Sequence, residues 1–85
     1  MLPAMFTVYV LHSPKYDKLY VGMTSNPEMR IFAHNNLPKG WTKKFRPWVL
    51  IYKEEYTTKS EAMTREAQLK SFQGREYIRR KLKEN

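Results

Sequence analysis

The sequence predicts an α/β protein of the α+β type, in which a small three-stranded antiparallel sheet is flanked by helices in the order ββαβαα. Two runs rich in β-branched and aromatic residues lie close together near the start of the chain, which is typical of a β-hairpin. A proline-initiated helix, a third strand-like run and two helical segments follow. Hydrophobic residues make up 41% of the 85 residues, enough for one compact domain spanning 1–85.

The predicted hairpin occupies the first quarter of the chain. Residues 6–11 (Phe-Thr-Val-Tyr-Val-Leu) favour a strand because β-branched and aromatic side chains pack well on a pleated surface. Pro14 and Asp17 favour a hairpin loop over residues 13–18. Residues 19–22 then form a short second strand, which we expect to run antiparallel to the first.

The Asn-Pro-Glu sequence at 26–28 predicts the start of a helix. Asparagine is a good N-cap, proline suits the first helical position, and an acidic residue there complements the helix dipole. The helix is expected to end near His34. At 100° per residue Met29, Phe32 and Ala33 share one side, which we expect to face the core.

The second half of the chain alternates between loops and regular segments. Residues 41–46 are predicted to form a basic loop, and residues 48–53 a third strand. A helix follows over 60–72, with Gly74 expected to interrupt it. Residues 75–83 then form a final basic helix.

Composition excludes several classes of protein. Because the chain has no cysteine, a disulfide framework and a thiolate metal site are both excluded. The apolar runs are too short to span a bilayer, and the first residues lack the pattern of a signal peptide. We therefore expect a cytoplasmic protein that does not bind membranes.

Positive charge is concentrated in two segments of the chain. The formal net charge is +8, from 16 Lys and Arg against 8 Asp and Glu. Such a field suits a phosphate backbone, although ordinary solvated lysines would give the same statistics. The candidate nucleic-acid-binding residues are Lys39, Lys43, Lys44 and Arg46 in the central segment and Arg79 and Arg80 in the last helix.

Two helices carry side chains that suit phosphate chemistry. Arg30 and His34 are four residues apart, so they share a helix face near the end of the second strand, where a guanidinium can bind a phosphate bidentately. Glu66 falls on the apolar arc of its helix, so its carboxylate needs a partner or a metal ion. A structural salt bridge to Lys70 or to Arg30 is the alternative.

Taken in order, these segments resemble the motifs of the GIY-YIG nuclease superfamily. Residues 7–9 (Thr-Val-Tyr) stand for the first motif, with threonine in place of its leading glycine, and residues 20–22 (Tyr-Val-Gly) for the second. Residues 26–35 are similar to the helix that carries the family's arginine, and residues 61–70 to the helix that carries its glutamate. The resemblance covers about residues 5–80 and is greatest to small stand-alone bacterial members.

The resemblance implies a metal-dependent endonuclease that hydrolyses phosphodiester bonds of DNA, in repair or recombination. Glu66 would hold one divalent cation, Mg²⁺ or Mn²⁺. Arg30 would neutralise charge developing on the phosphate, and His34 would belong to the same catalytic group. Tyr9 is assigned as the general base and Tyr20 as a phosphate ligand, with nearby cations needed to lower the pKa of the base.

The implied partner is nucleic acid, DNA rather than RNA, and the sequence leaves any protein partner unknown. The alternative is a basic nucleic-acid-binding module with weak or absent catalysis. A structural adaptor has the least support, because no large apolar patch is predicted. Dependence on a divalent metal separates the first two hypotheses, since binding alone needs no Mg²⁺.

Overall fold

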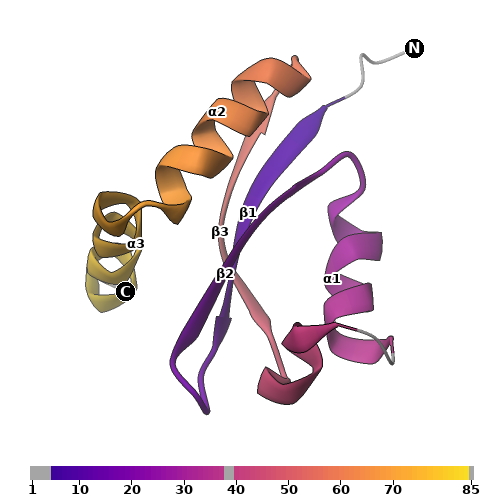
Figure 1. The fold of residues 1–85 in the computed structure, drawn as a ribbon, viewed down its shortest axis with the longest axis vertical. Coiled ribbons are helices and arrows are strands. Elements are labelled where there is room, and N and C mark those ends of the chain that lie inside the picture. Colours follow the sequence, from indigo (N-terminus) through magenta and orange to yellow (C-terminus); the bar gives the residue numbers. More distant parts are fainter. Residues whose placement is uncertain (1–4, 38–39, 85) are drawn as a thin grey trace.

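The computed structural model describes residues 5–37 and 40–84, and the predicted order ββαβαα is confirmed (Figure 1). β1 lies at the centre of the sheet, antiparallel to both neighbours, in the strand order β2-β1-β3. In the described ranges, no helix has both the length and the apolar character needed to cross a membrane. The elements are β1 (Phe6–Ser13), β2 (Lys18–Thr24), α1 (Pro27–Asn36), the 3₁₀ helix η1 (Trp41–Phe45), β3 (Val49–Tyr56), α2 (Lys59–Lys70) and α3 (Phe72–Glu84).

The sheet separates two layers of helices, with α2 and α3 on one side and α1 and η1 on the other (Figure 1). Side chains alternate along a strand, so β1 supplies both cores. Val8 and Val10 pack beneath α2 and α3. Tyr9 and Leu11 point to the other side and pack with Trp48. The first-motif tyrosine therefore lies in the α1 layer.

The prediction that Met29, Phe32 and Ala33 face the core is wrong. Met29 is 66% exposed and Phe32 58%, and Ala33 is only half-buried. The helix instead turns Ile31 and His34 toward the sheet. The two hydrogen bonds that a buried histidine makes can stabilise the fold more than the burial of a larger apolar side chain would. A helical wheel, which shows hydrophobicity alone, does not include this contribution.

Two segments of the second half differ in type or division from the prediction, and β3 extends to Tyr56 rather than ending at residue 53. Residues 41–45 form η1 rather than a loop. The last two helices separate at Ser71, not at Gly74, because the Ser71 hydroxyl accepts the Gly74 N–H at 3.1 Å and starts α3. Gly74 serves close packing instead: a Cβ atom there would lie 2.2 Å from the Gln68 carbonyl oxygen.

Helix α2 is anchored to β3 by a charged cluster around Glu54. Arg65 donates from Nε and from a terminal nitrogen to the two carboxylate oxygens, at 2.8 and 3.1 Å. The Tyr52 and Tyr56 hydroxyls also donate to Glu54. Burial alone would raise the pKa of Glu54, but these hydrogen bonds hold it below its ordinary value. The cluster fixes the rotation of α2 at Arg65, and thereby the position of the next residue, Glu66.

Candidate active site

Tyr9 and Gly22 lie next to each other at the base of the candidate site. The two residues are directly opposite each other in the β1–β2 pairing, so their side chains belong on the same face of the sheet. A Cβ atom at residue 22 would lie 2.4 Å from the Tyr9 hydroxyl oxygen and 2.5 Å from the carbon that bears it. The second-motif glycine is therefore required by the first-motif tyrosine, whose ring lies where any other side chain would begin.

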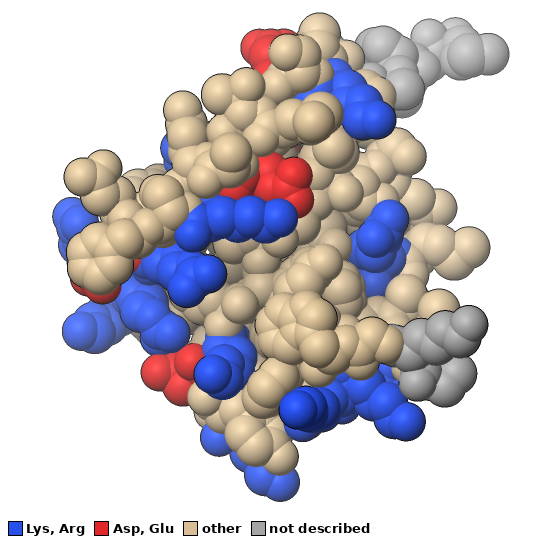
Figure 2. All heavy atoms as spheres, in the orientation of Figure 1, with Lys and Arg blue, Asp and Glu red and all other residues tan. Residues whose placement is uncertain are grey.

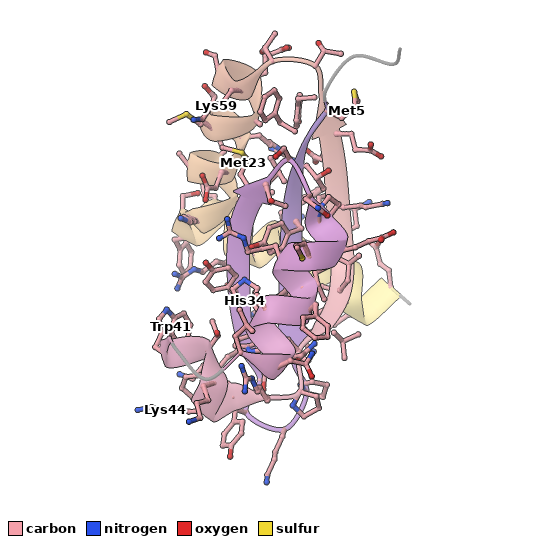
Figure 3. All side chains as sticks on the ribbon, turned by 90° about the vertical axis from the view of Figure 1, so that its right-hand side faces the viewer. Met5, Met23, His34, Trp41, Lys44 and Lys59 are labelled. Atoms are coloured by element: carbon pink, nitrogen blue, oxygen red, sulfur yellow. The ribbon has the colours of Figure 1, made fainter. Side chains whose placement is uncertain are left out.

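A hydrogen-bonded chain runs from the sheet through α1 to η1. The Tyr9 hydroxyl lies 3.1 Å from His34 Nε2, and His34 Nδ1 lies 3.2 Å from Thr42 Oγ1. All three side chains are buried. The Tyr20 ring packs against the His34 ring with their centroids 4.4 Å apart. Figure 3 shows His34 on α1 above Trp41, which projects from η1 at the edge of the molecule.

Burial and the neighbouring charges set the protonation of this chain. Burial lowers the pKa of His34, and the Arg30 and Arg46 guanidinium groups lower it further, so the imidazole is neutral at neutral pH. Burial raises the pKa of Tyr9 above its ordinary value, and Tyr20 adds to the effect. Arg30 opposes it. At neutral pH a protonated tyrosine therefore contacts a neutral histidine.

Arg30, Tyr20 and His34 surround one hollow of about 230 Å³, here called the Arg30 hollow. Arg30 is exposed at its mouth, because the N-cap at Asn26 begins α1 beside the end of β2. Residues of the second motif and of the arginine helix thus meet at one place, and Tyr9 of the first motif contacts His34 there. The full lining is Tyr20, Arg30, Ala33, His34, Leu37, Gly40, Trp41 and Thr42. Two larger hollows, of about 460 and 600 Å³, are not lined by any predicted catalytic residue, and a third, of about 380 Å³, is lined by Tyr20.

Glu66 approaches the same centre from the other layer of the fold. Its carboxylate is near enough to Tyr9 for its charge to raise the pKa of that hydroxyl. It also forms the ion pair with Lys70 that was one alternative for this residue, at 3.1 Å. The pair is open to water, with 54% of the Lys70 side chain and 23% of the Glu66 side chain exposed. The other alternative, a salt bridge to Arg30, is absent from the described residues.

The donor set fits a magnesium-like ion. In residues 5–37 and 40–84, no three His, Asp or Glu side chains come together as a preformed metal site. Mg²⁺ is commonly held through one or two carboxylates, with water and substrate phosphates completing its octahedron. A single partly exposed carboxylate such as Glu66 matches that requirement, whereas it would not suffice for a structural zinc site.

The predicted nucleic-acid-binding residues divide into free and engaged groups. Lys43 and Lys44 are exposed on η1, and Arg80 is exposed on α3. Arg79 donates to the Asp17 side chain at 2.9 Å. Figure 2 shows basic side chains on both flanks of the face that carries β2. Lys39 lies outside the described residues.

Arg46 has a structural contact that its place in a basic run did not indicate. Its Nε donates to the His34 carbonyl at 2.6 Å, and a terminal nitrogen donates to the carbonyls of Ala33 and Leu37. These carbonyls lie in the last turn of α1 and at its C-cap, where the Ala33 carbonyl also accepts the Leu37 N–H, so Arg46 caps the helix that carries His34. Its contact with a phosphate stays a prediction.

Asn35 and Thr42 are two further residues whose hydrogen bonds hold the candidate site together, and the sequence did not indicate a role for either. The Asn35 amide pairs with the backbone of Trp48, donating to its carbonyl at 3.1 Å and accepting its N–H at 2.7 Å. Thr42 holds the second nitrogen of His34. The position of Asn35 next to His34 in the helix motif could have pointed to it. Nothing in the sequence around Thr42 indicates that it contacts His34.

Asn35→Ala is expected to destabilise the protein by about 1–3 kcal/mol, because it leaves two backbone groups of Trp48 without a partner. Urea unfolding measures the effect. Asn36→Ala is the matched control: that amide is exposed and bonds only along its own helix, to Phe32, so its loss should cost less than about 0.5 kcal/mol. Equal losses at both positions would contradict the clamp between α1 and β3.

The depressed pKa of His34 predicts a pH-dependent stability. The unfolded chain binds a proton at this residue near its ordinary value of about 6.5, whereas the folded protein resists it. The free energy of unfolding should therefore decrease as the pH falls from about 7 to about 5, more steeply in the wild type than in His34→Gln. Urea unfolding across this range gives both slopes. Equal slopes would mean that folding does not perturb His34.

Comparison with known proteins agrees with this geometry. A family model described as the GIY-YIG catalytic domain matches residues 5–80. The chain is 48% identical over 67 residues to a UPF0213 protein of Staphylococcus haemolyticus, a match that covers 76% of this chain and 79% of the relative. It is 46% identical over 56 residues to a UPF0213 protein of Staphylococcus epidermidis, covering 64% and 67% respectively.

A more distant similarity connects the chain to larger fungal proteins. It is 39% identical over 56 residues to the structure-specific endonuclease subunit slx1 of Neurospora crassa. That match covers 59% of this chain but 14% of the fungal protein. The resemblance drawn from the four motifs, and its direction toward small bacterial proteins, is confirmed.

Proposed function

Because the chain belongs to the GIY-YIG catalytic-domain family, we propose that it is a metal-dependent endonuclease that hydrolyses phosphodiester bonds of DNA. The observation that carries the proposal is the meeting of Tyr20, Arg30 and His34 at one hollow, with Tyr9 behind His34. The relative named a structure-specific endonuclease subunit supports it. Such an activity would serve repair or recombination, where branched DNA has to be cut.

Arg30 binds the scissile phosphate in this proposal. Its guanidinium is exposed at the mouth of the hollow and is not in an ion pair with any residue in the described ranges. A planar donor fork can hold two phosphate oxygens at once and stabilise the charge that grows on them as the bond to the leaving oxygen lengthens. Tyr20, on the wall of the same hollow, donates to the phosphate from its hydroxyl.

Tyr9 and His34 remove the proton from the attacking water. The raised pKa of Tyr9 rules out a standing tyrosinate at neutral pH, so Tyr9 must lose its own proton as it accepts another. His34 Nε2, at 3.1 Å, is placed to accept it, because the lowered pKa of His34 keeps the ring neutral. Nδ1–H donates to Thr42 and holds the ring in this tautomer.

Glu66 would hold the divalent cation through its carboxylate, and the solvent-exposed pair with Lys70 costs little to open. The cation would supply Lewis-acid stabilisation of the leaving oxygen. The anchoring of Arg65 to Glu54 keeps the carboxylate in place while Lys70 moves. The chain would therefore supply one carboxylate ligand to the cation, from Glu66.

The test is a panel of end-labelled DNA substrates (single strand, duplex, flap and four-way junction), each incubated with the protein and Mg²⁺, Mn²⁺ or a chelator. Cleavage that requires a divalent ion and that favours at least one branched substrate is expected. Binding to all four substrates with no product under either ion would contradict the proposal and favour the binding module. Salt titration of the same complexes reports the number of phosphates contacted, with a log–log slope of about −0.9 for each on duplex.

A further inference from the structure

Trp41 is an exposed aromatic side chain held in one orientation by other rings. It is 54% exposed, although it contacts Tyr20, Phe45 and Trp48 at centroid distances of 5.8, 5.5 and 6.2 Å. These rings are tilted from the indole by 49°, 71° and 89°, so none of them stacks parallel on its plane. The contacts fix the indole while leaving more than half of its surface open, which lowers the entropy cost of stacking a ligand on it.

Trp41 also lines two hollows, each of which has a basic side chain in its lining. One is the Arg30 hollow. The other is a hollow of about 380 Å³, here called the Lys70 hollow, which Trp41 and Tyr20 share with Lys70 and Arg75. Its volume falls within the range of roughly 300–1,000 Å³ that is common for small-ligand pockets. In the part of the chain that the structure describes, no acidic side chain pairs with Arg75.

The order of groups along this surface is cation, aromatic ring, cation. That order matches one nucleotide of a single strand, in which a base lies between two phosphates. A base inside a duplex has both faces covered by its neighbours, so it cannot stack on the indole without leaving the helix. An unpaired base has a free face.

We propose that Trp41 is a stacking platform for an unpaired nucleobase adjoining the phosphate bound at Arg30, with Lys70 and Arg75 binding the next phosphate along the strand. The inference rests on the proposed DNA-cleaving site and specifies its substrate as DNA with a single-stranded segment at the point of cleavage. Lys70 connects the metal-binding part of the site with the strand-binding part. When its ion pair with Glu66 opens, the Glu66 carboxylate can bind the cation and the Lys70 ammonium can bind a phosphate of the strand.

The experiment uses a hairpin DNA with a single-stranded flap, a matched hairpin without a flap, and a chelator throughout, so that no cleavage occurs. The flap DNA should quench Trp41 fluorescence, while the buried Trp48, 3% exposed, continues to emit. Trp41→Leu should weaken flap binding about 10-fold and change binding to the blunt hairpin less than about 2-fold, as expected for the loss of one base–aromatic stack. Trp41→Phe should retain most of the affinity.

An abasic scan separates stacking from a general loss of structure. Removing one flap base near the junction should weaken wild-type binding about as much as Trp41→Leu does, and should cost Trp41→Leu nothing further. Phe72→Leu is the matched control, because that ring is 78% exposed at the start of α3 and lines neither hollow. It should bind both DNAs like the wild type.

The platform is refuted if Trp41→Leu and Trp41→Phe both bind flap DNA like the wild type, or if no single abasic position weakens wild-type binding. These readings do not depend on catalysis. Cleavage in Mg²⁺ without any quenching of Trp41 would refute the stacking platform but support the endonuclease. Quenching and sensitivity to an abasic position, without cleavage in either metal, would refute the endonuclease but support a binding site for an unpaired base.

Discussion

Glu66→Gln is expected to abolish metal-dependent cleavage while DNA affinity stays the same or rises slightly. The amide keeps the shape of the side chain but loses the charge that holds a divalent cation. It also removes one negative charge from a surface that binds phosphates, which favours the complex. Cleavage of the best substrate in Mg²⁺, and binding of the same substrate in chelator, are the two measurements.

The stability of Glu66→Gln decides between a metal ligand and a structural residue. The Glu66–Lys70 pair is an exposed i,i+4 contact, so its loss should change the free energy of unfolding by less than about 1 kcal/mol. Glu61→Gln is the matched control on the same helix: it also removes one charge, but glutamine can still accept from the Thr58 hydroxyl. It should cleave normally. A large loss of stability in Glu66→Gln, with the cleavage rate per folded molecule unchanged, would overturn the role of Glu66.

Arg30→Ala is expected to lower the cleavage rate on the order of 10²–10³-fold and to weaken ground-state binding much less. Arg30 is one of 16 basic residues for binding, yet it lies at the mouth of the hollow where the charge develops. Single-turnover kinetics on saturating DNA measure the rate, and a filter-binding titration measures the affinity. Arg30→Lys, which keeps the charge but loses the fork, should recover part of the rate.

Lys59→Ala controls for the loss of one positive charge. Figure 3 places Lys59 at the opposite end of the molecule from Trp41 and Lys44. It should cleave at the wild-type rate. If Arg30→Ala cleaves within a few-fold of the wild type, Arg30 does not bind the reacting phosphate, and the assignment of the helix motif is wrong.

The element order could be predicted from the sequence because local signals agreed with the final packing. Asn26 and Pro27 begin α1 as predicted, with the Asn26 side chain accepting the Met29 N–H. The hairpin was equally predictable, because its loop contains Pro14 and Asp17. In the structure Asp17 adopts a positive φ of 52°, as turn residues often do. In each case one short segment determines its own conformation.

The errors occur where a distant partner decides the outcome. Which face of α1 turns inward depends on the hydrogen bonds of His34 with Tyr9 and Thr42, and both residues lie outside the helix. The helix break is a local exception: the Ser71 hydroxyl accepts the Gly74 N–H and starts α3, whereas the sequence offered Gly74 as the stronger helix breaker. The engagement of Arg46 with the end of α1 likewise follows from the path of the chain between α1 and β3. Hydrophobic periodicity contains none of this information, because it describes a helix without its neighbours.

The contact between Gly22 and Tyr9 has a consequence for how such chains can diverge. A methyl group at position 22 would overlap the hydroxyl oxygen of Tyr9 and the ring carbon next to it, so the ring itself would have to move. Phenylalanine at position 9 would not relieve the overlap, since the ring carbon is also too close. Only a side chain smaller than phenylalanine there would accommodate the methyl group, and it would carry no phenolic hydroxyl. The two strand motifs are therefore coupled: in this chain a side chain at position 22 is incompatible with the observed position of the Tyr9 ring, so the glycine of the second motif and the tyrosine of the first have to change together.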